Sequence, residues 1–241
     1  MILSEIKPEN VLYLDIETVP QCATYVELPA PMRELWNHKA ATLIRSAEAE
    51  TPESLYPRAG IYAEFGRIVC ISVGMVVPKG ERRTFRVKSF AGRDECQLLL
   101  DFALMLNQFG QRAGATLCGH NAKEFDFPFI ARRMLINGVQ LPLLLDIAGR
   151  KPWEVRLLDT MELWKFGDYK HYTSLRLLTQ VFGIPSPKDD IDGSQVADCY
   201  YIDNDIERIA VYCEKDVLAV AQLLLRYKGL PLIDAADVER V

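Results

Sequence analysis

Two carboxylates stand close together at the end of a short apolar segment. The sequence reads VLYLDIE from Val11, so one residue separates Asp15 from Glu17. The apolar run is typical of a buried strand, in which side chains two positions apart point to the same face. Two carboxylates on a buried face repel each other and lose hydration, and a hard divalent cation such as Mg²⁺ or Mn²⁺ offsets both costs. The alternative is that both acids lie beyond the strand end in solvent.

A third acid, Asp126, lies in the segment GHNAKEFDFPFI. Pro128 fits the first turn of a helix, so a helix-capping role for Asp126 is the alternative to a metal-binding one. Asn121 follows an expected strand, and its amide is suited to holding backbone or substrate. Phe125 either joins the core or stacks on a base, and the core is favoured for this ring taken alone.

The third segment, YCEKDV, places Tyr212 and Asp216 four residues apart in an expected helix, so both lie on one helical face. Their neighbours on that side include Ile209 and Val220. A carboxylate on an apolar face needs a partner, which is either a metal ion or the hydroxyl of Tyr212 itself. Glu214 lies off this face and is expected to be solvated.

Other polar residues near these segments have structural interpretations. Arg132 and Arg133 follow Asp126 on the same expected helix, and a solvated helix face is favoured over contact with phosphate. Asp159 ends the segment LLD, and capping of the helix that starts at Thr160 is favoured over support of a metal site.

The elements that must position these residues follow from hydrophobic periodicity and turn residues. The segments RIVCISVGMVV and RTFRVKSF, separated by PKGE, predict an antiparallel hairpin. The order of strand, hairpin, helix, strand, helix, strand and helices predicts a mixed sheet flanked by helices, an α/β fold. The expected strands are 11–16, 67–77, 83–90, 115–120 and the start of 155–164, and the expected helices are 94–109, 127–138, the end of 155–164, 174–183 and 203–228.

Residues from about 20 to 60 have a different character. Prolines at 20, 29, 31, 52 and 57 surround a stretch from Met32 to about Ala49 that is compatible with a helix. We expect an insertion that packs on a single domain covering residues 1–241. The last residues, IDAADVERV, are expected to be loosely held.

Composition limits the possible functions. Apolar residues make up 49% of the chain and charged residues 25%, which suits a sizeable core and argues against wholesale disorder. The net charge of −5 argues against a protein that grips nucleic acid with a broadly basic surface. The six cysteines form no CxxC pair and the three histidines are scattered, so no zinc site is suggested. Without a signal peptide or a long apolar span, we expect a soluble, cytoplasmic protein that does not enter a membrane.

Taken together, the acidic segments resemble a known motif set. Asp-Ile-Glu-Thr on the first strand, Asn-x-x-x-Phe-Asp-x-Pro before a helix and Tyr-x-x-x-Asp on a late helix resemble the three exonuclease motifs of the DEDD superfamily, and the tyrosine is similar to that of its DEDDy branch. The chain resembles the proofreading exonuclease domains of family B DNA polymerases. Stretches such as FGRIVCISVG and LLDTMELW also resemble the predicted stand-alone PolB-like 3′→5′ exonucleases. The resemblance runs from about Val11 to Arg226.

The resemblance implies a ribonuclease H-like fold and a 3′→5′ exonuclease that hydrolyses phosphodiester bonds of DNA with two divalent cations, Mg²⁺ or Mn²⁺. It implies that Asp15 bridges both metals and that Glu17 and Asp216 complete the site of the metal that holds the attacking water. Asp126 would support the second metal through waters. Tyr212 would orient the attacking water, because a phenol with a pKa of about 10 is a poor base at neutral pH.

The implied partner is a single-stranded 3′ end of nucleic acid, with DNA favoured over RNA. Thr18, Asn121 and Phe125 are the candidates for holding its terminal nucleotides, and stacking of a base on an aromatic ring contributes ~1–3 kcal/mol. Two alternatives stay open: an exoribonuclease with the same site, and a catalytically idle module that only binds nucleic acid or a partner protein. Four acids that repel phosphate argue against the second alternative.

Overall fold

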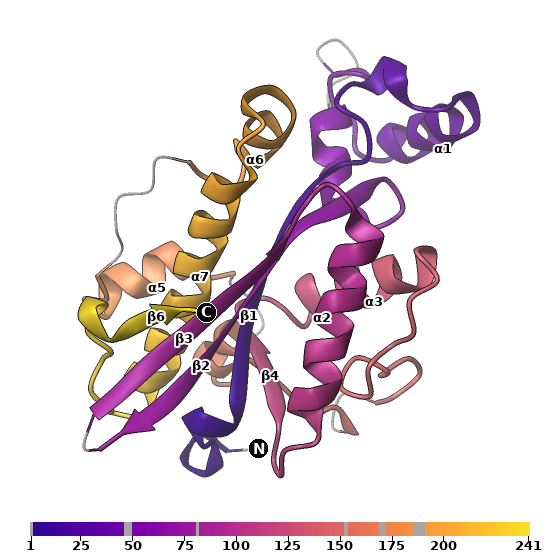
Figure 1. Cartoon of the computed structure of the whole chain (residues 1–241). Helices are drawn as coiled ribbons and strands as arrows, with labels where there is room; N and C mark the ends of the chain where they lie inside the picture. The colour runs from indigo at the N-terminus through magenta and orange to yellow at the C-terminus, as the bar shows by residue number, and fades with distance from the viewer. Residues whose placement is uncertain (1, 46–49, 81, 152–153, 169–171, 186–190) are drawn as a thin grey trace.

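The computed structural model describes residues 2–45, 50–80, 82–151, 154–168, 172–185 and 191–241. Within them, a six-stranded sheet carries helices on both faces (Figure 1). The strands are β1 Val11–Pro20, β2 Gly66–Lys79, β3 Arg82–Ala91, β4 Thr116–Gly119, β5 Leu157–Asp159 and β6 Val238–Arg240. The helices are α1 Ala30–Ala41, α2 Glu95–Gly110, α3 Asp126–Ile136, α4 Thr160–Lys165, α5 Leu175–Val181, α6 Val196–Asp198 with the π-helical turn Cys199–Asp203, and α7 Ile206–Tyr227.

The sheet is mixed, with strand order β5-β4-β1-β2-β3-β6. Strands β1, β2 and β3 form an antiparallel meander, whereas β4 and β5 continue parallel to β1 on its other side. The carboxyl ends of β1, β4 and β5 therefore meet at one edge of the sheet. This mixed sheet with helices on both faces confirms the expected α/β, ribonuclease H-like class, and the expected hairpin is the β2–β3 pair.

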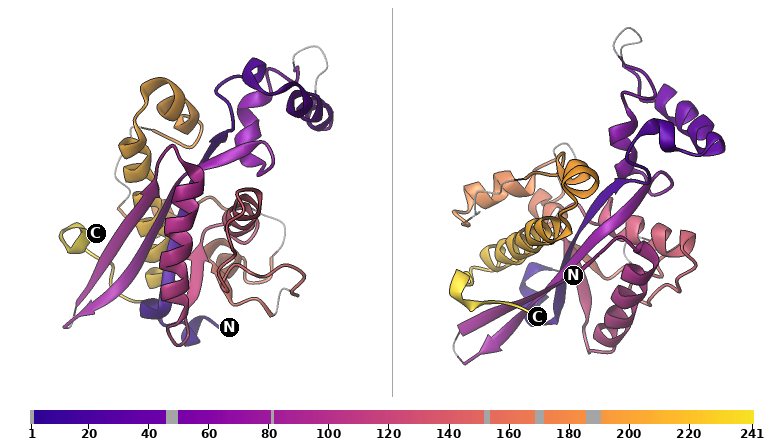
Figure 2. Two further views of the ribbon diagram at one scale, coloured as in Figure 1. Left: turned by 45° about the vertical axis from the view of Figure 1, so that its right-hand side comes forward. Right: turned by 45° about the horizontal axis from the view of Figure 1, so that its top comes forward.

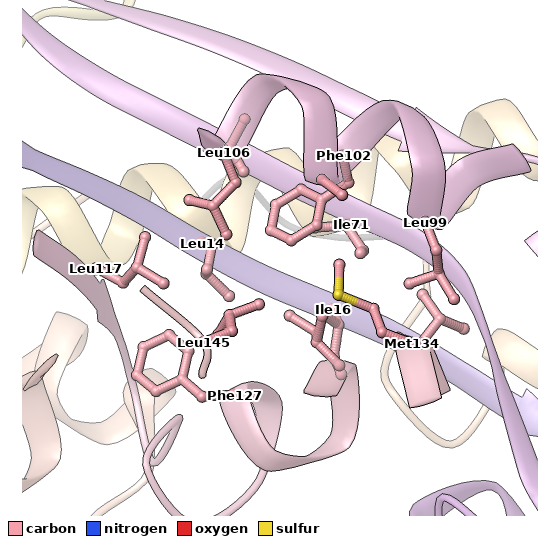
Figure 3. Close-up of a cluster of buried hydrophobic side chains, with 14 of the residues drawn as sticks. Leu14, Ile16, Ile71, Leu99, Phe102, Leu106, Leu117, Phe127, Met134 and Leu145 are labelled. Atoms are coloured by element: carbon pink, nitrogen blue, oxygen red, sulfur yellow. The ribbon is translucent and has the colours of Figure 1, made fainter. Parts of the chain in front are cut away.

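Strand β1 is buried on both of its faces, as its continuous apolar run predicted. Leu14 and Ile16 point into a core that they share with α2 and α3 (Figure 3). Tyr13, on the opposite face, packs with Val217 of α7. Because side chains alternate along a strand, Asp15 projects toward the α7 side.

The two helical layers bury different faces of the sheet. Helices α2 and α3 cover one face, and the long helix α7 covers the other (Figure 1). Helix α2 begins after the N-cap residue Asp94, whose carboxylate accepts a hydrogen bond from the main-chain N–H of Gln97 over 3.0 Å. Helix α7 begins at Asp205 in the same way. The active-site candidates on α7 and β1 therefore belong to packed elements rather than to loops.

The end of β4 passes unusually close to β1. A Cβ atom on Gly119 would lie 2.4 Å from Cβ of Ala122 and 3.1 Å from the carbonyl oxygen of Leu14. Only glycine fits this approach without a shift of the neighbouring backbone. The turn that follows Gly119 is thereby held against the middle of β1.

Residues 20–45 and 50–65 form a lobe at one end of the sheet, and both views of Figure 2 show α1 projecting there. The lobe has its own small core, in which Trp36 is fully buried against Tyr56 and Phe65. The helix expected from Met32 to about Ala49 is shorter, because α1 ends at Ala41, and residues 46–49 lie outside the described residues. The division into a single domain with an insertion stays a prediction.

The C-terminal segment differs from the expectation of a loosely held tail. Strand β6 pairs in parallel with β3, and the main-chain N–H of Val241 donates to the carbonyl of Val87 over 3.0 Å. Arg240 also pairs with Glu214, at 2.6 Å between Nε and Oε2. A three-residue strand without alternating apolar residues gives too weak a pattern for sequence analysis to find. Among the described residues no helix is long and apolar enough to span a bilayer.

Candidate active site

The two acids of β1 face α7 near the middle of the sheet. Glu17 is 8% exposed and Asp15 is half-buried. The thiol of Cys213, on α7, lies 3.5 Å from Oδ2 of Asp15 and 3.4 Å from its carbonyl oxygen. One ligand atom from each of Asp15, Glu17 and Cys213 falls within 4.8 Å of the others. The alternative in which both acids lie beyond the strand end in solvent is therefore wrong.

Asp126 reaches the same region from α3. It is the first residue of the helix, Phe125 occupies the N-cap position, and no side chain caps the helix there. Oδ1 of Asp126 instead accepts a hydrogen bond from the main-chain N–H of Ile16 over 3.2 Å. Strand β4 pairs with β1 only as far as Tyr13, so this N–H lies on a stretch of β1 that β4 does not cover. The alternative of an ordinary N-cap aspartate is therefore wrong.

Tyr212 and Asp216 lie one helical turn apart on α7, and a hydrogen bond joins their side chains. Both are half-buried. The carboxylate of Asp216 is close enough to raise the pKa of both Asp15 and Glu17. The structure thus brings all five proposed catalytic residues together from three elements that are far apart in the sequence.

The electrostatics of the cluster are unfavourable for bare carboxylates. Burial, followed by repulsion from Asp126, Asp216 and Glu17, raises the pKa of Asp15 well above its ordinary value. Burial and then Asp216 raise the pKa of Glu17 in the same direction. Burial raises the pKa of Asp126 to about 7, although its backbone hydrogen bonds act in the opposite direction. A divalent cation would relieve this repulsion, so the donor set fits hard cations that prefer carboxylate oxygens.

Cys213 is a contact that sequence reasoning missed, because the spacing of the cysteines argued only against a zinc site. Burial raises the pKa of its thiol well above the ordinary value, so it stays protonated and donates to Asp15. A soft sulfur donor also does not suit Mg²⁺. The available signal was its position three residues before Asp216, on the same face of the helix.

Asp159, at the end of β5, organises the turn that leads to Asp126. It is 3% exposed and caps α4 through the main-chain N–H of Met161, at 2.9 Å. It also accepts the main-chain N–H groups of Asn121 at 2.9 Å and Lys123 at 3.1 Å. The favoured capping role is confirmed, and the same carboxylate fixes the start of the turn that positions Asp126.

The three candidates for nucleotide binding lie close to acids of the cluster along the chain. Asn121 adopts a left-handed conformation with φ of 61°, and its side-chain Oδ1 is buried with no hydrogen-bond partner in the described part of the chain. Thr18 is half-buried beside an irregularity in the β1–β2 pairing. Phe125 is half-buried and packs on Phe129, with 5.4 Å between ring centroids, so most of this ring serves the core.

Two expectations for charged residues are wrong. Arg133 does not lie on a solvated face: it is 8% exposed, and its Nε donates to Oε1 of Glu95 over 2.9 Å. Arg132 is exposed, as expected. Glu214 is also 8% exposed and accepts a hydrogen bond from Ser89. Both errors arise because the partner of each charge lies on another element, which periodicity along one helix does not reveal.

Comparison with known proteins identifies the family of the chain. Residues 61–232 match the family model described as a predicted 3′-5′ exonuclease related to the exonuclease domain of PolB. The matched range contains Asp126, Tyr212 and Asp216, whereas Asp15 and Glu17 precede it. The search of curated proteins gave no match.

Among solved structures, the chain is similar to the family B DNA polymerase from the hyperthermophilic archaeon Pyrobaculum calidifontis, with 18% identity and a TM-score of 0.49. The similarity covers 90% of this chain and 24% of the polymerase, so the chain spans about a quarter of that protein's length. Because the family model covers well over half of the 241 residues, the chain belongs to the family of predicted 3′-5′ exonucleases related to the exonuclease domain of PolB.

Proposed function

We propose that this protein is a metal-dependent 3′→5′ exonuclease that hydrolyses phosphodiester bonds at the 3′ end of DNA. The observation that carries the proposal is the convergence of Asp15, Glu17, Asp126 and Asp216, whose mutual repulsion and burial raise the pKa values of three of them. Such an arrangement is costly in a purely structural domain. It suits a site that binds cations and acts on a phosphodiester.

Two divalent cations, Mg²⁺ or Mn²⁺, would supply an activated water and stabilise the charge on the leaving oxygen when bound in this cluster. Asp15, Glu17 and Asp216 would hold one cation. Asp15, with Asp126 acting through water molecules, would hold the other. The hydrogen bond from the main-chain N–H of Ile16 holds the carboxylate of Asp126 beside β1 for this role.

Tyr212 positions the attacking water through its hydroxyl group. Burial, followed by the nearby carboxylate of Asp216, raises the pKa of this phenol far above neutral pH, so it stays protonated. A protonated phenol can hold a water molecule by hydrogen bonding but cannot remove its proton. Its hydrogen bond to Asp216 keeps the ring beside the cluster.

Asn121, Thr18 and Phe125 hold the terminal nucleotides in this proposal. Asn121 offers the strongest support, because its buried Oδ1 has no hydrogen-bond partner within the described residues. The hydrogen bond from its main-chain N–H to Asp159 fixes the backbone from which that side chain extends. Phe125 presents only the part of its ring that the core leaves exposed.

The proposal is tested with matched single-stranded DNA and RNA, each labelled at the 5′ end, incubated with Mn²⁺ and with EDTA. We expect a ladder of shortened, still labelled DNA products that disappears in EDTA. Immediate release of the label as a mononucleotide would show the opposite polarity. Faster shortening of RNA than of DNA would favour an exoribonuclease with the same site. Intact substrate in every condition would favour a module that only binds.

A further inference from the structure

An arginine lies on β2 just beyond the carboxylate cluster. Arg67 pairs across the sheet with Val19, two residues after Glu17 on β1. Cross-strand partners share a face of the sheet. Val19 packs with Cys213 of α7, the residue whose thiol contacts Asp15. Arg67 therefore starts on the side of the sheet that carries the acids, but its guanidinium reaches the carbonyl of Arg93 at the start of α2, a helix of the opposite face.

Arg67 lines a shallow hollow of about 580 Å³ beside the first turn of α2. Gln21, four residues after Glu17, also lines the hollow. At about 3.3 Å per residue of strand, the hollow begins about 13 Å along the chain from Glu17. This separation, which is the span of a few nucleotides, places the hollow outside the cluster itself.

The hollow is lined by three arginines, but only one of them is neutralised. Arg133 forms a buried pair with Glu95. Asp94, the other acid of the hollow, already caps α2. Arg67 and Arg93 have no carboxylate within ion-pair distance among the residues described by the structure. Three arginines thus face two acids, so the hollow carries an excess of one positive charge.

Main-chain and amide oxygens, rather than acids, hold these two arginines in place. Arg67 donates through Nη2 to the carbonyl of Arg93, and its buried Nε has no partner in the described ranges. Arg93 donates to the carbonyl of Tyr200 over 3.2 Å and to the side chain of Asn204. Its guanidinium lies 4.8 Å from the ring centroid of Tyr200. Carbonyl contacts fix a guanidinium without cancelling its charge, so both cations are pre-organised for an anion.

We propose that Arg67 and Arg93 form a subsite that binds a backbone phosphate of single-stranded nucleic acid upstream of the 3′ end. This inference rests on the proposed exonuclease function. The chain has a net charge of −5 and a cluster of four acids, so a polyanionic strand needs a local cationic contact to stay bound. Arginine suits this contact, because its planar fork matches phosphate and its charge persists at every physiological pH.

The test measures binding in the background of Asp216→Asn with Mg²⁺, so that the strand is not degraded. Fluorescence anisotropy of a 5′-labelled 12-mer and a dinucleotide is followed at salt concentrations from about 50 to 200 mM. Arg67→Gln and Arg93→Gln are compared with Arg67→Lys, which keeps the charge. Arg132→Gln is the matched control, because Arg132 is exposed on α3 and lines no part of the hollow. Thermal melting of each variant checks that the fold is intact.

We expect each glutamine variant to bind the 12-mer several-fold more weakly and to lower the magnitude of the salt slope by about 0.7, the value for one phosphate contact with a single strand. Arg67→Lys and Arg132→Gln should keep the parent slope. The dinucleotide should bind equally to all variants, because it is too short to reach the hollow. If one glutamine variant has a lower Tm than the parent, the comparison uses the variant at the other arginine, since either one tests the subsite.

Three outcomes would overturn the subsite. The first is that both glutamine variants keep the salt slope of the parent protein. The second is an equal loss of dinucleotide affinity, which would place the arginines at the reacting end. The third is weaker binding of a free nucleoside monophosphate without any effect on the 12-mer, which would indicate a product site. If the parent itself binds neither oligonucleotide, the proposed function fails together with the subsite.

Discussion

The main-chain N–H of Ile16 donates a hydrogen bond to Oδ1 of Asp126 over 3.2 Å, although 110 residues separate the two in sequence. This bond joins the first turn of α3 to β1 between Asp15 and Glu17. It is possible because β4 pairs with β1 only from Val11 to Tyr13 and then turns away. One carboxylate thus satisfies a buried N–H and completes the acidic cluster at the same time.

Metal binding should stabilise the fold. A ligand that binds only the folded state stabilises it by about 2.7 kcal/mol at a hundredfold excess over Kd, or roughly 5–10 °C in Tm for a chain of this size. We expect such a shift when Mg²⁺ or Mn²⁺ replaces EDTA in a thermal melt. Asp15→Asn should raise the Tm in EDTA, by removing repulsion, and should lose most of the shift. Asp198→Asn changes an exposed acid and should behave as wild type. An unchanged wild-type Tm at millimolar metal would contradict the account.

Stability without metal should fall as the pH rises. The pKa of Asp126 is about 7 in the folded protein, against an ordinary value of 3.8, so folding favours its protonated form. This contribution is fully present below about pH 4 and is lost as the pH rises through about 7. We expect the Tm of wild type in EDTA to fall relative to that of Asp126→Asn over this window. A Tm difference that does not change with pH would show that Asp126 is not buried beside other acids.

Tyr212→Phe should slow turnover on the order of 10²-fold without weakening substrate binding, because it removes only the hydroxyl that orients water. Steady-state kinetics separate kcat from KM, and anisotropy measures binding independently. The pH–rate profile of the variant should keep the shape of the wild-type profile, since the raised pKa of Tyr212 excludes its titration near neutral pH. A loss of affinity with an unchanged kcat would instead assign Tyr212 to substrate binding.

Gly119→Ala should displace the turn that carries Asn121 and Asp126. The added Cβ meets Ala122 at 2.4 Å and the carbonyl of Leu14 at 3.1 Å, and overpacking of this kind costs about 1–3 kcal/mol. We expect a lower midpoint of urea unfolding and a larger loss of activity than of stability. Gly193→Ala is the matched control, because a Cβ added at Gly193 has no neighbour within 4 Å among the described atoms. Equal effects of the two substitutions would show that the close approach at Gly119 is unimportant.

Much of the fold could be predicted from local patterns. The continuous apolar run of β1 indicated a strand buried on both faces, and the turn residues between β2 and β3 indicated their hairpin. The pairing of β6 with β3 and the shortness of α1 could not be predicted, because tertiary contacts rather than local periodicity define them. The burial of Arg133 and Glu214 could not be predicted for the same reason, since their partners Glu95 and Arg240 come from distant segments.

The site could be predicted only in part. The spacing of Asp15 and Glu17, and that of Tyr212 and Asp216, determined which side chains share a face. Spacing did not reveal that Asp126 takes the N–H of Ile16 instead of capping α3, nor that Cys213 donates to Asp15. Those contacts depend on where β4 ends and on how α7 packs against β1, and neither is encoded within a single motif.

The central claim is that the carboxylate cluster performs metal-dependent hydrolysis at a 3′ end. The most direct measurement compares wild type with Asp216→Asn on 5′-labelled single-stranded DNA in Mn²⁺, with Asp198→Asn as the control on an exposed acid. We predict that wild type and Asp198→Asn shorten the strand stepwise from the 3′ end, and that Asp216→Asn leaves it intact while melting cooperatively like wild type. Stepwise shortening by Asp216→Asn at the wild-type rate would contradict the account.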